Sequence, residues 1–390
     1  MIVTDEFFEN NCITYDVKRI AAPSDILFID IETTGLTPRN SYIYMVGVVY
    51  FLDNRWYYKN LFATSPADEE VLLKELIHII STFRVLIHFN GTRFDLPFIT
   101  SRCEAYGIDI NLSALDSHDL YKDFKPLRFI LGTGDCRQKT LEQFIGLNRE
   151  DKYSGGELIP VYKHYCSSCD DESFSLLYQH NRDDLYGMLR LLDIFSVFDF
   201  FEAPLSITDV NINSYINFTG ESARELLISF ESMVTIPGRI STNKSSVFLT
   251  IDGSNGLLRL PVIEAKLNYY YKNYKDYYYL PSENMAVHKS VGQFVDKEFR
   301  QKATADTAYT SKESTYILWD GTLSLPTFST DRKSKDKYIE LNDELINNKE
   351  LLAEYTLNII KRLREKYSLS LLLFLVEKRI QSLVTDISVF

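Results

Sequence analysis

Three short acidic motifs in the first half of the chain combine residue types that bind metal ions. Asp30 and Glu32 stand two residues apart in DIETTG, Asp95 follows the turn in HFNGTRFDLPF, and YQHNRDDLYGM contains His180 and Asp184. Residues two apart in a strand point to the same side, and residues four apart in a helix share one face. Each motif therefore gathers its side chains at one place if its element forms as expected.

These residue types predict binding of hard cations. Oxygen ligands suit Mg²⁺ and Mn²⁺, and like charges at a strand end repel each other unless a cation neutralises them. We therefore expect metal ligation, by a pair of Mg²⁺ or Mn²⁺ ions, at Asp30, Glu32, Asp95 and Asp184. Two such ions about 4 Å apart clamp a phosphodiester, one activating water and the other stabilising the leaving oxygen. His180 is the candidate general base.

The hydrophobic pattern predicts the elements that position these residues. We expect a buried strand over 25–35, two strands around the turn Asp53-Asn54 within 42–63, a helix over 68–83, a strand over 85–91, a helix beginning in FDLPFITSRCEAYG, and a long helix from about Ser173 to Phe198. Three successive strands followed by helix, strand and helix are typical of an α/β mixed sheet flanked by helices.

The three motifs, in this order and spacing, resemble the exonuclease motifs of the DEDD-type 3′–5′ exonucleases, which have the ribonuclease-H-like fold. The segment KTLEQFIGLNREDKYSGGELIPVYKHY is similar to the bacterial YprB-like ribonuclease H-like domain proteins. The resemblance covers about residues 25–198 and implies hydrolysis of phosphodiester bonds in single-stranded nucleic acid by two metal ions. It also implies that the residues lining the cleft around the terminal nucleotide are Thr33, Thr34, Gly35, Leu36, Asn90, Gly91 and Phe94.

The general-base position departs from the pattern of this superfamily. There, either a tyrosine with three intervening residues or a histidine with four precedes the last aspartate. Here His180 has three residues between it and Asp184, so a histidine occupies the tyrosine spacing. Tyr178 lies two residues earlier, off the face that Asp184 shares. We therefore expect His180 to be the base.

We expect the chain to divide into an N-terminal extension (1–24), a ribonuclease-H-like exonuclease domain (25–198) and a C-terminal α+β domain (199–390). The boundary follows a break in the pattern near Phe198–Pro204. The 390 residues carry a formal net charge of −12, almost all of it in the first half. This balance excludes a protein that holds nucleic acid mainly by a global positive field.

The second half contains strand-like runs, SSVFLTI and GLLRLPV, and a stretch from Lys266 to Ala303 that interleaves tyrosines with basic residues. We expect a helix over Glu283–Lys302, in which Lys289, Lys297 and Arg300 meet phosphates while tyrosine rings stack on bases. The alternative is a strand of buried tyrosines followed by a solvated helix. If the helix contacts phosphates, the C-terminal domain adds binding rather than chemistry. If the helix is only a solvated face, the domain needs another role, such as holding a protein partner.

The remaining features limit the cellular context and the alternatives. The N-terminus lacks a signal-peptide pattern, and the apolar run at 368–376 is too short for a membrane span, which predicts a cytoplasmic protein without membrane contact. The Cys166–Cys169 pair lacks the second pair of a zinc site.

The rival function is a non-catalytic nucleic-acid-binding or scaffolding module, and a weaker rival is a structure-specific endonuclease. The sequence does not distinguish DNA from RNA and leaves protein partners unknown.

Overall fold

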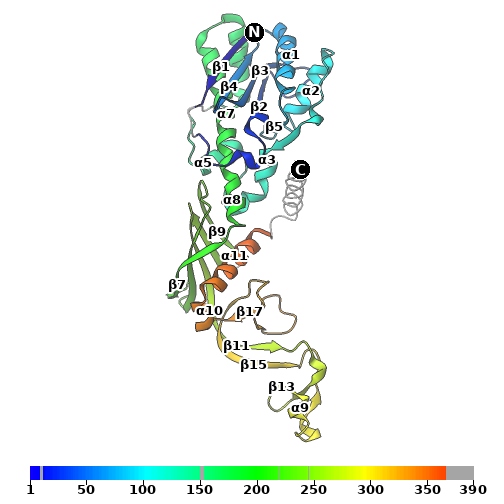
Figure 1. Ribbon diagram of the computed structural model, residues 1–390, viewed down its shortest axis with the longest axis vertical. Helices are drawn as coiled ribbons and strands as arrows, with labels where there is room; N and C mark the ends of the chain where they lie inside the picture. The colour runs from blue at the N-terminus through cyan, green and yellow to red at the C-terminus, as the bar shows by residue number, and fades with distance from the viewer. Residues whose placement is uncertain (9–11, 150–152, 218, 245, 366–390) are drawn as a thin grey trace. The chain divides into compact units, whose positions relative to one another are not determined.

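The computed structural model describes residues 1–8, 12–149, 153–217, 219–244 and 246–365. These residues fall into two compact units, one of Met1–Phe198 with Ile236–Gly238, and one of Asp199–Thr235 with the described residues from Arg239 on (Figure 1). Within this part of the chain, no helix combines the length and apolar character needed to cross a bilayer. The apolar run at 368–376 lies outside the described residues.

A six-stranded mixed sheet forms the centre of the first unit, in the order β1-β4-β3-β2-β5-β6. Its antiparallel part consists of β1 (Ile2–Phe7), β4 (Arg55–Phe62), β3 (Ile43–Leu52) and β2 (Ile26–Thr33), and β5 (Val85–His88) and β6 (Asp116–Asp119) continue it in parallel. Because β2 has neighbours on both sides, nearly all its residues are buried. Part of the N-terminal extension, as β1, is an edge strand of this sheet.

Helices cover both faces of the sheet (Figure 1). The helices α1 (Glu69–Ile80) and α2 (Asp95–Ala105) pack on the face that carries Leu27 and Ile29. On the opposite face, α6 (Gly155–Ser168) and α7 (Asp171–Leu191) pack against Tyr44 and Phe62. The shorter helices are α3 (Leu120–Phe124), α4 (Arg128–Leu131), α5 (Gln138–Phe144) and α8 (Phe195–Phe200).

The α/β class and the mixed sheet flanked by helices are confirmed. The hairpin turn joins β3 to β4 through Asp53 and Asn54, whose φ angles of 46° and 65° are those of the two-residue turns that favour these residue types. The long helix begins slightly earlier than expected, at Asp171. A 3₁₀ turn over Leu192–Ile194 separates α7 from α8, so the predicted single helix is two.

The second unit is rich in sheet, as an α+β domain requires. Its larger sheet contains β7 (Leu205–Ile216), β8 (Ser222–Ser232), β9 (Arg239–Lys244), β10 (Val247–Asp252), β11 (Asn255–Tyr270), β15 (Tyr309–Leu318), β16 (Thr327–Ser329) and β17 (Tyr338–Glu340). The long strand β11 pairs with β8 and β10 through its first part and with β15 and β16 through its second. The helices α10 (Asp343–Asn347) and α11 (Lys349–Glu365) follow.

The predicted helix over Glu283–Lys302 is wrong. This segment contributes β13 (Met285–His288) and β14 (Gln301–Lys302) to a three-stranded sheet around β12 (Tyr277–Leu280), with α9 (Lys289–Gly292) as its one short α-helix. Pairing with the tyrosine-rich strand outweighs local helix propensity here. Val291 and Phe294 are 65% and 82% exposed, so this segment does not bury an apolar helix face.

Candidate metal centre

The strand β2 presents two carboxylates on the face that α7 covers. Asp30 pairs with Gly47 of β3 and Glu32 with Met45, so both side chains stand on one side of the sheet. Asp30 keeps part of its surface exposed, but the protein around it desolvates the carboxylate. This burial raises the pKa of Asp30 well above its usual value, and repulsion from the other acids of the cluster raises it further.

A missing side chain at Gly47 allows α7 to lie close to these carboxylates. A Cβ at this position would stand 2.0 Å from Asn181 Oδ1 and 2.4 Å from a methyl of Leu185. Asn181 is fully buried and donates a hydrogen bond of 2.8 Å from Nδ2 to Asp30 Oδ2. The hydroxyl of Tyr58 donates to Asn181 Oδ1 at 2.9 Å. The amide is therefore held from both sides and links α7 to β2.

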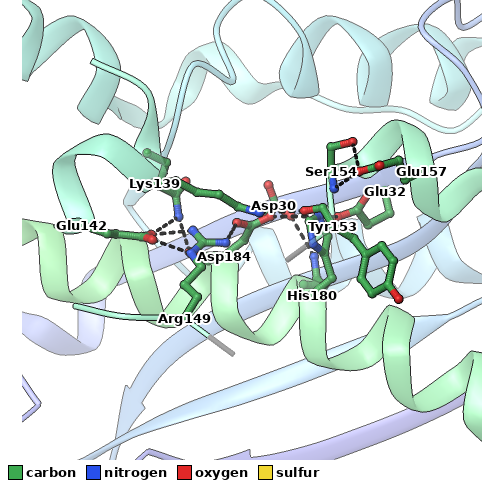
Figure 2. Close-up of polar contacts among 12 residues, drawn as sticks. Asp30, Glu32, Lys139, Glu142, Arg149, Tyr153, Ser154, Glu157, His180 and Asp184 are labelled. Carbon is green, nitrogen blue, oxygen red and sulfur yellow. Dashed lines mark hydrogen bonds and ion pairs between the residues drawn. The ribbon is translucent and has the colours of Figure 1, made fainter. Parts of the chain in front are cut away.

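His180 lies between acids of two different elements (Figure 2). Its Nε2 is 3.3 Å from Glu32 Oε1 and 3.3 Å from Asp184 Oδ2. The ligand atoms of these three residues all lie within 4.8 Å of one another, a spacing that suits a metal ion. The imidazole is 4% exposed. The spacing that predicted a shared helix face for His180 and Asp184 thus brings both to Glu32.

Asp95 joins the cluster from the first turn of α2. It is buried, and burial raises the pKa of its carboxyl from 3.8 to about 7. Hydrogen bonds from the backbone N–H groups of Asp95 and Ile31 oppose this shift, whereas repulsion from Asp119 and Asp184 adds to it. Since Asp30 is repelled by Asp184, Glu32 and Asp95 alike, the four predicted ligands lie within electrostatic reach of one another.

The turn before α2 is held by two residues that the motif analysis did not select. Asp119, at the end of β6, accepts hydrogen bonds from the backbone N–H groups of Asn90 (2.8 Å) and Thr92 (3.4 Å). His88 is fully buried; its Nδ1 accepts from the Gly91 N–H at 3.1 Å, and its Nε2 lies 2.8 Å from Ser117 Oγ. Burial lowers the pKa of His88 to about 4, so the ring is neutral and fixes the turn.

The predicted nucleotide-contacting residues occupy the two turns beside the carboxylates. Thr33 donates from its hydroxyl to the carbonyl of Gly35 at 2.8 Å, which closes the turn after β2. Leu36, on the same turn, is 84% exposed. On the other turn, Asn90 has a left-handed backbone with φ of 59°, and a Cβ on Gly91 would meet the His88 ring at 2.8 Å. Thr34 donates its N–H to the Tyr42 carbonyl at 3.0 Å, and the Phe94 ring packs at a tilt against Phe98, with ring centroids 5.5 Å apart.

Tyr44 is a further residue that the motifs did not indicate. It lies on β3, is fully buried, and stacks on Tyr162 with ring centroids 4.1 Å apart. Burial and the charges of Glu32 and Asp30 raise the pKa of its hydroxyl. Within the described residues this hydroxyl has no hydrogen-bond partner. A buried, unpartnered donor beside two carboxylates fits a site that is completed by further ligands.

Arg149 and Glu142 complete the surroundings of Asp184 (Figure 2). The Arg149 guanidinium forms hydrogen bonds to both carboxylate oxygens of Glu142 and to Asp184 Oδ1. Arg149 falls in the segment that resembles the YprB-like branch, but residue types alone gave it no role.

The basic residues predicted to contact phosphates belong to the second unit. We call Lys289, Lys297 and Arg300 the basic cluster. The Arg300 guanidinium lies 4.6 Å from the ring centroid of Tyr278, and Lys289 Nζ lies 5.8 Å from the same centroid. Arg300 also donates to the Gly292 carbonyl. Two of the three cations therefore gather on one tyrosine ring, although not on a continuous helix.

Residues 27–196 match the family RNase_H_2, described as the RNase_H superfamily. These residues form a ribonuclease H superfamily domain. A stretch of 45 residues is 40% identical to a DNA polymerase of Methanocaldococcus jannaschii, covering 12% of this chain and 3% of the polymerase. The resemblance to the YprB-like branch stays a prediction.

Two solved structures are similar to parts of this chain. The family B DNA polymerase of Pyrobaculum calidifontis has 15% identity and a TM-score of 0.37, covering 45% of this chain and 25% of that one. Exonuclease I of E. coli, in complex with a dT13 oligonucleotide, has 12% identity and a TM-score of 0.30, covering 53% of this chain and 54% of that one. The chain thus spans about half or less of the length of these relatives.

Proposed function

We propose that the ribonuclease-H-like domain is a metal-dependent nuclease that hydrolyses phosphodiester bonds of single-stranded nucleic acid from the 3′ end. The observation that carries this proposal is the close grouping of Glu32, His180 and Asp184, with the carboxylates of Asp30 and Asp95 within electrostatic reach of it. Buried like charges destabilise a fold without a cation, so their retention from three separate elements favours a catalytic centre over a structural one.

The donor set fits two Mg²⁺ or Mn²⁺ ions, because it consists of carboxylate oxygens from β2, α2 and α7. When bound, such ions activate a water molecule and stabilise the leaving oxygen of an in-line displacement. The protein would contribute the orientation of the ligands. Asn181 fixes Asp30, the turn before α2 fixes Asp95, and the rigid helix α7 fixes Asp184.

His180 is the proposed general base, which takes the proton from the attacking water. Its position between Glu32 and Asp184 places the ring within the carboxylate cluster. Tyr178, the other candidate, packs instead against the rings of Tyr58 and Phe174, with centroids 5.4 and 5.8 Å apart. This packing supports the assignment to His180.

The turn after β2 and the turn before α2 would receive the terminal nucleotide. Leu36 offers a largely exposed apolar side chain on which a base can stack, next to the ligands of β2. Asn90, Gly91 and Phe94 would line the other side. The basic cluster of the second unit would hold the backbone of the strand, adding affinity rather than chemistry.

The decisive experiment incubates the protein with 5′-labelled single strands of DNA and of RNA, with Mg²⁺ and with Mn²⁺. A ladder that shortens from the 3′ end supports the proposal and identifies the sugar. Asp184→Asn is expected to lower the rate by orders of magnitude, because it replaces a ligand carboxylate. The matched control is Asp183→Asn, which alters the neighbouring carboxylate of the same helix; its Oδ1 accepts from Gln179 at 2.6 Å.

The other outcomes separate the rival functions. Internal cleavage products instead of a ladder indicate an endonuclease on the same fold. Strand binding without cleavage, together with no uptake of Mn²⁺ in a titration, indicates a non-catalytic binding or scaffolding module. Equal loss of activity in Asp183→Asn and Asp184→Asn would contradict the assignment of Asp184 as a ligand.

A further inference from the structure

The Glu142–Arg149 pair is a buried ion pair with a third partner, Asp184. The side chain of Glu142 is 1% exposed and that of Arg149 6%. The guanidinium uses Nε and one terminal nitrogen for the two oxygens of Glu142 and the other terminal nitrogen for Asp184 Oδ1. Burial opposes the charge, but the hydrogen bonds and charges of Glu142 and Asp184 together raise the pKa of Arg149. The Arg149 guanidinium therefore stays positively charged.

The packing around Glu142 is built to hold this pair. Gln138, on α5, donates from Nε2 to Glu142 Oε1 at 3.0 Å and to the backbone carbonyl of Asp184 at 2.6 Å. Gly187, three residues after Asp184, makes room for the acid, because a Cβ there would stand 1.8 Å from Glu142 Oε1. The helix α5 is thus attached to α7 at the turn that carries the metal-ligand candidate.

The pair leaves one specific oxygen of Asp184 for the cluster. Oδ1 accepts from Arg149, whereas Oδ2 lies 3.3 Å from His180 Nε2, on the side of Glu32. A carboxylate on a helix surface rotates freely unless a second contact holds it. Since the charges of Glu142 and Arg149 cancel, this contact orients Asp184 with little change in the net charge that a cation experiences.

We infer that Arg149, held by Glu142, is a positioning residue that orients Asp184 for metal binding. The inference rests on the proposed metal-dependent function and extends it beyond the direct ligands. Replacing a residue that hydrogen-bonds a metal ligand without contacting the metal typically changes metal affinity by about 10–100-fold.

Mn²⁺ titration of the full chain, followed by calorimetry, tests this inference without any measurement of activity. Arg149→Lys keeps the charge but cannot reach both acids with a planar fork, so Mn²⁺ affinity is expected to fall about tenfold or more. The matched control is Arg102→Lys. Arg102 forms the same forked contact with buried Glu69, at 2.9 and 2.6 Å, and neither residue is among the proposed metal ligands. The Arg102→Lys variant is expected to be less stable than the wild type but to bind Mn²⁺ with the same affinity.

A double variant, Glu142→Leu with Arg149→Met, guards against failure to fold. Replacing a buried ion pair by apolar residues of similar size leaves no unpaired charge and is often neutral for stability. The net charge is also unchanged, so a fall in affinity reports the lost orientation of Asp184.

Each outcome decides between explanations. Unchanged Mn²⁺ affinity in both variants would show that the pair is only structural, and increased affinity would show that Arg149 competes with the cation for Asp184; either result overturns the inference. If the wild-type protein itself binds no Mn²⁺, the proposed function fails, which is a different result from loss in the variants alone.

Discussion

Asp95→Asn is expected to stabilise the metal-free first unit at neutral pH. The pKa of Asp95 rises on folding from 3.8 to about 7, mainly through burial. Between these values the folded state holds a proton that the unfolded state releases, so wild-type stability falls as the pH rises from about 4 to about 7. At about 1.4 kcal/mol per pKa unit, the loss amounts to about 4 kcal/mol above pH 7. Asparagine has no charge to bury and escapes this loss.

The assay is urea unfolding in EDTA at pH 5 and pH 8. The sequence contains two tryptophans, Trp56 in the first unit and Trp319 in the second. A Trp319→Phe background leaves the buried Trp56 as the fluorescent reporter of the first unit. The advantage of Asp95→Asn over Asp95 should be about 3 kcal/mol larger at pH 8 than at pH 5, because two pKa units separate pH 5 from the folded pKa.

Mn²⁺ is expected to remove most of the stability advantage of Asp95→Asn at pH 8. Metal binding stabilises only a protein with an intact site, by about 2.7 kcal/mol when the free ion exceeds its Kd 100-fold. Burial of an ionisable carboxylate at this position is refuted if the stability difference between Asp95→Asn and the wild type is the same at pH 5 and pH 8. It is also refuted if Asp95→Asn is less stable than the wild type at pH 8 in EDTA.

Three further predictions address the helix, the base and the second unit. Gly47→Ala should displace α7 through the Asn181 side chain. This should lower the free energy of unfolding, measured in urea, by about 1–3 kcal/mol and the turnover of labelled strands about 100-fold. The control is Gly156→Ala, because a Cβ at Gly156 meets nothing within 4 Å. His180→Ala should lower kcat by about 10²–10⁴ while Tyr178→Phe keeps it, and the reverse result moves the base to Tyr178. Replacing the basic cluster by alanine should reduce the slope of log binding constant against log salt concentration by about 0.7 per lost contact, with turnover at saturating strand unchanged. An unaltered slope would show that the cluster does not contact phosphates.

The sequence predicted which site residues lie together wherever the residues belong to one strand or one helix, because the backbone repeat then determines the face. Asp30 and Glu32 share a face because a strand alternates, and His180 and Asp184 share one because a helix repeats about every four residues. Apolar runs likewise located β2, β3, β4 and β5 of the first sheet, whereas the edge strands β1 and β6 were not predicted. These features depend on neighbours in sequence, which a single chain displays directly.

The parts that escaped prediction depend on contacts between distant segments. Arg149 reaches Asp184 only because α5 docks on α7 at Gly187, and no periodic pattern marks that docking. Asp119 meets Asn90 through the parallel pairing of β5 and β6. In the second unit the same kind of contact, pairing with the tyrosine-rich β12, turned an expected helix into strands.

The helix α7 carries His180, Asn181 and Asp184 within a single turn, and this arrangement limits how the sequence can diverge. One residue inserted between Asn181 and Asp184 would rotate the aspartate by about 100° away from the cluster. Insertions in the connections between elements leave those angles intact, because surface loops absorb length changes. Homologues should therefore differ freely in the distances between the three motifs, while length changes inside HNRDD should appear only in chains that have lost the activity.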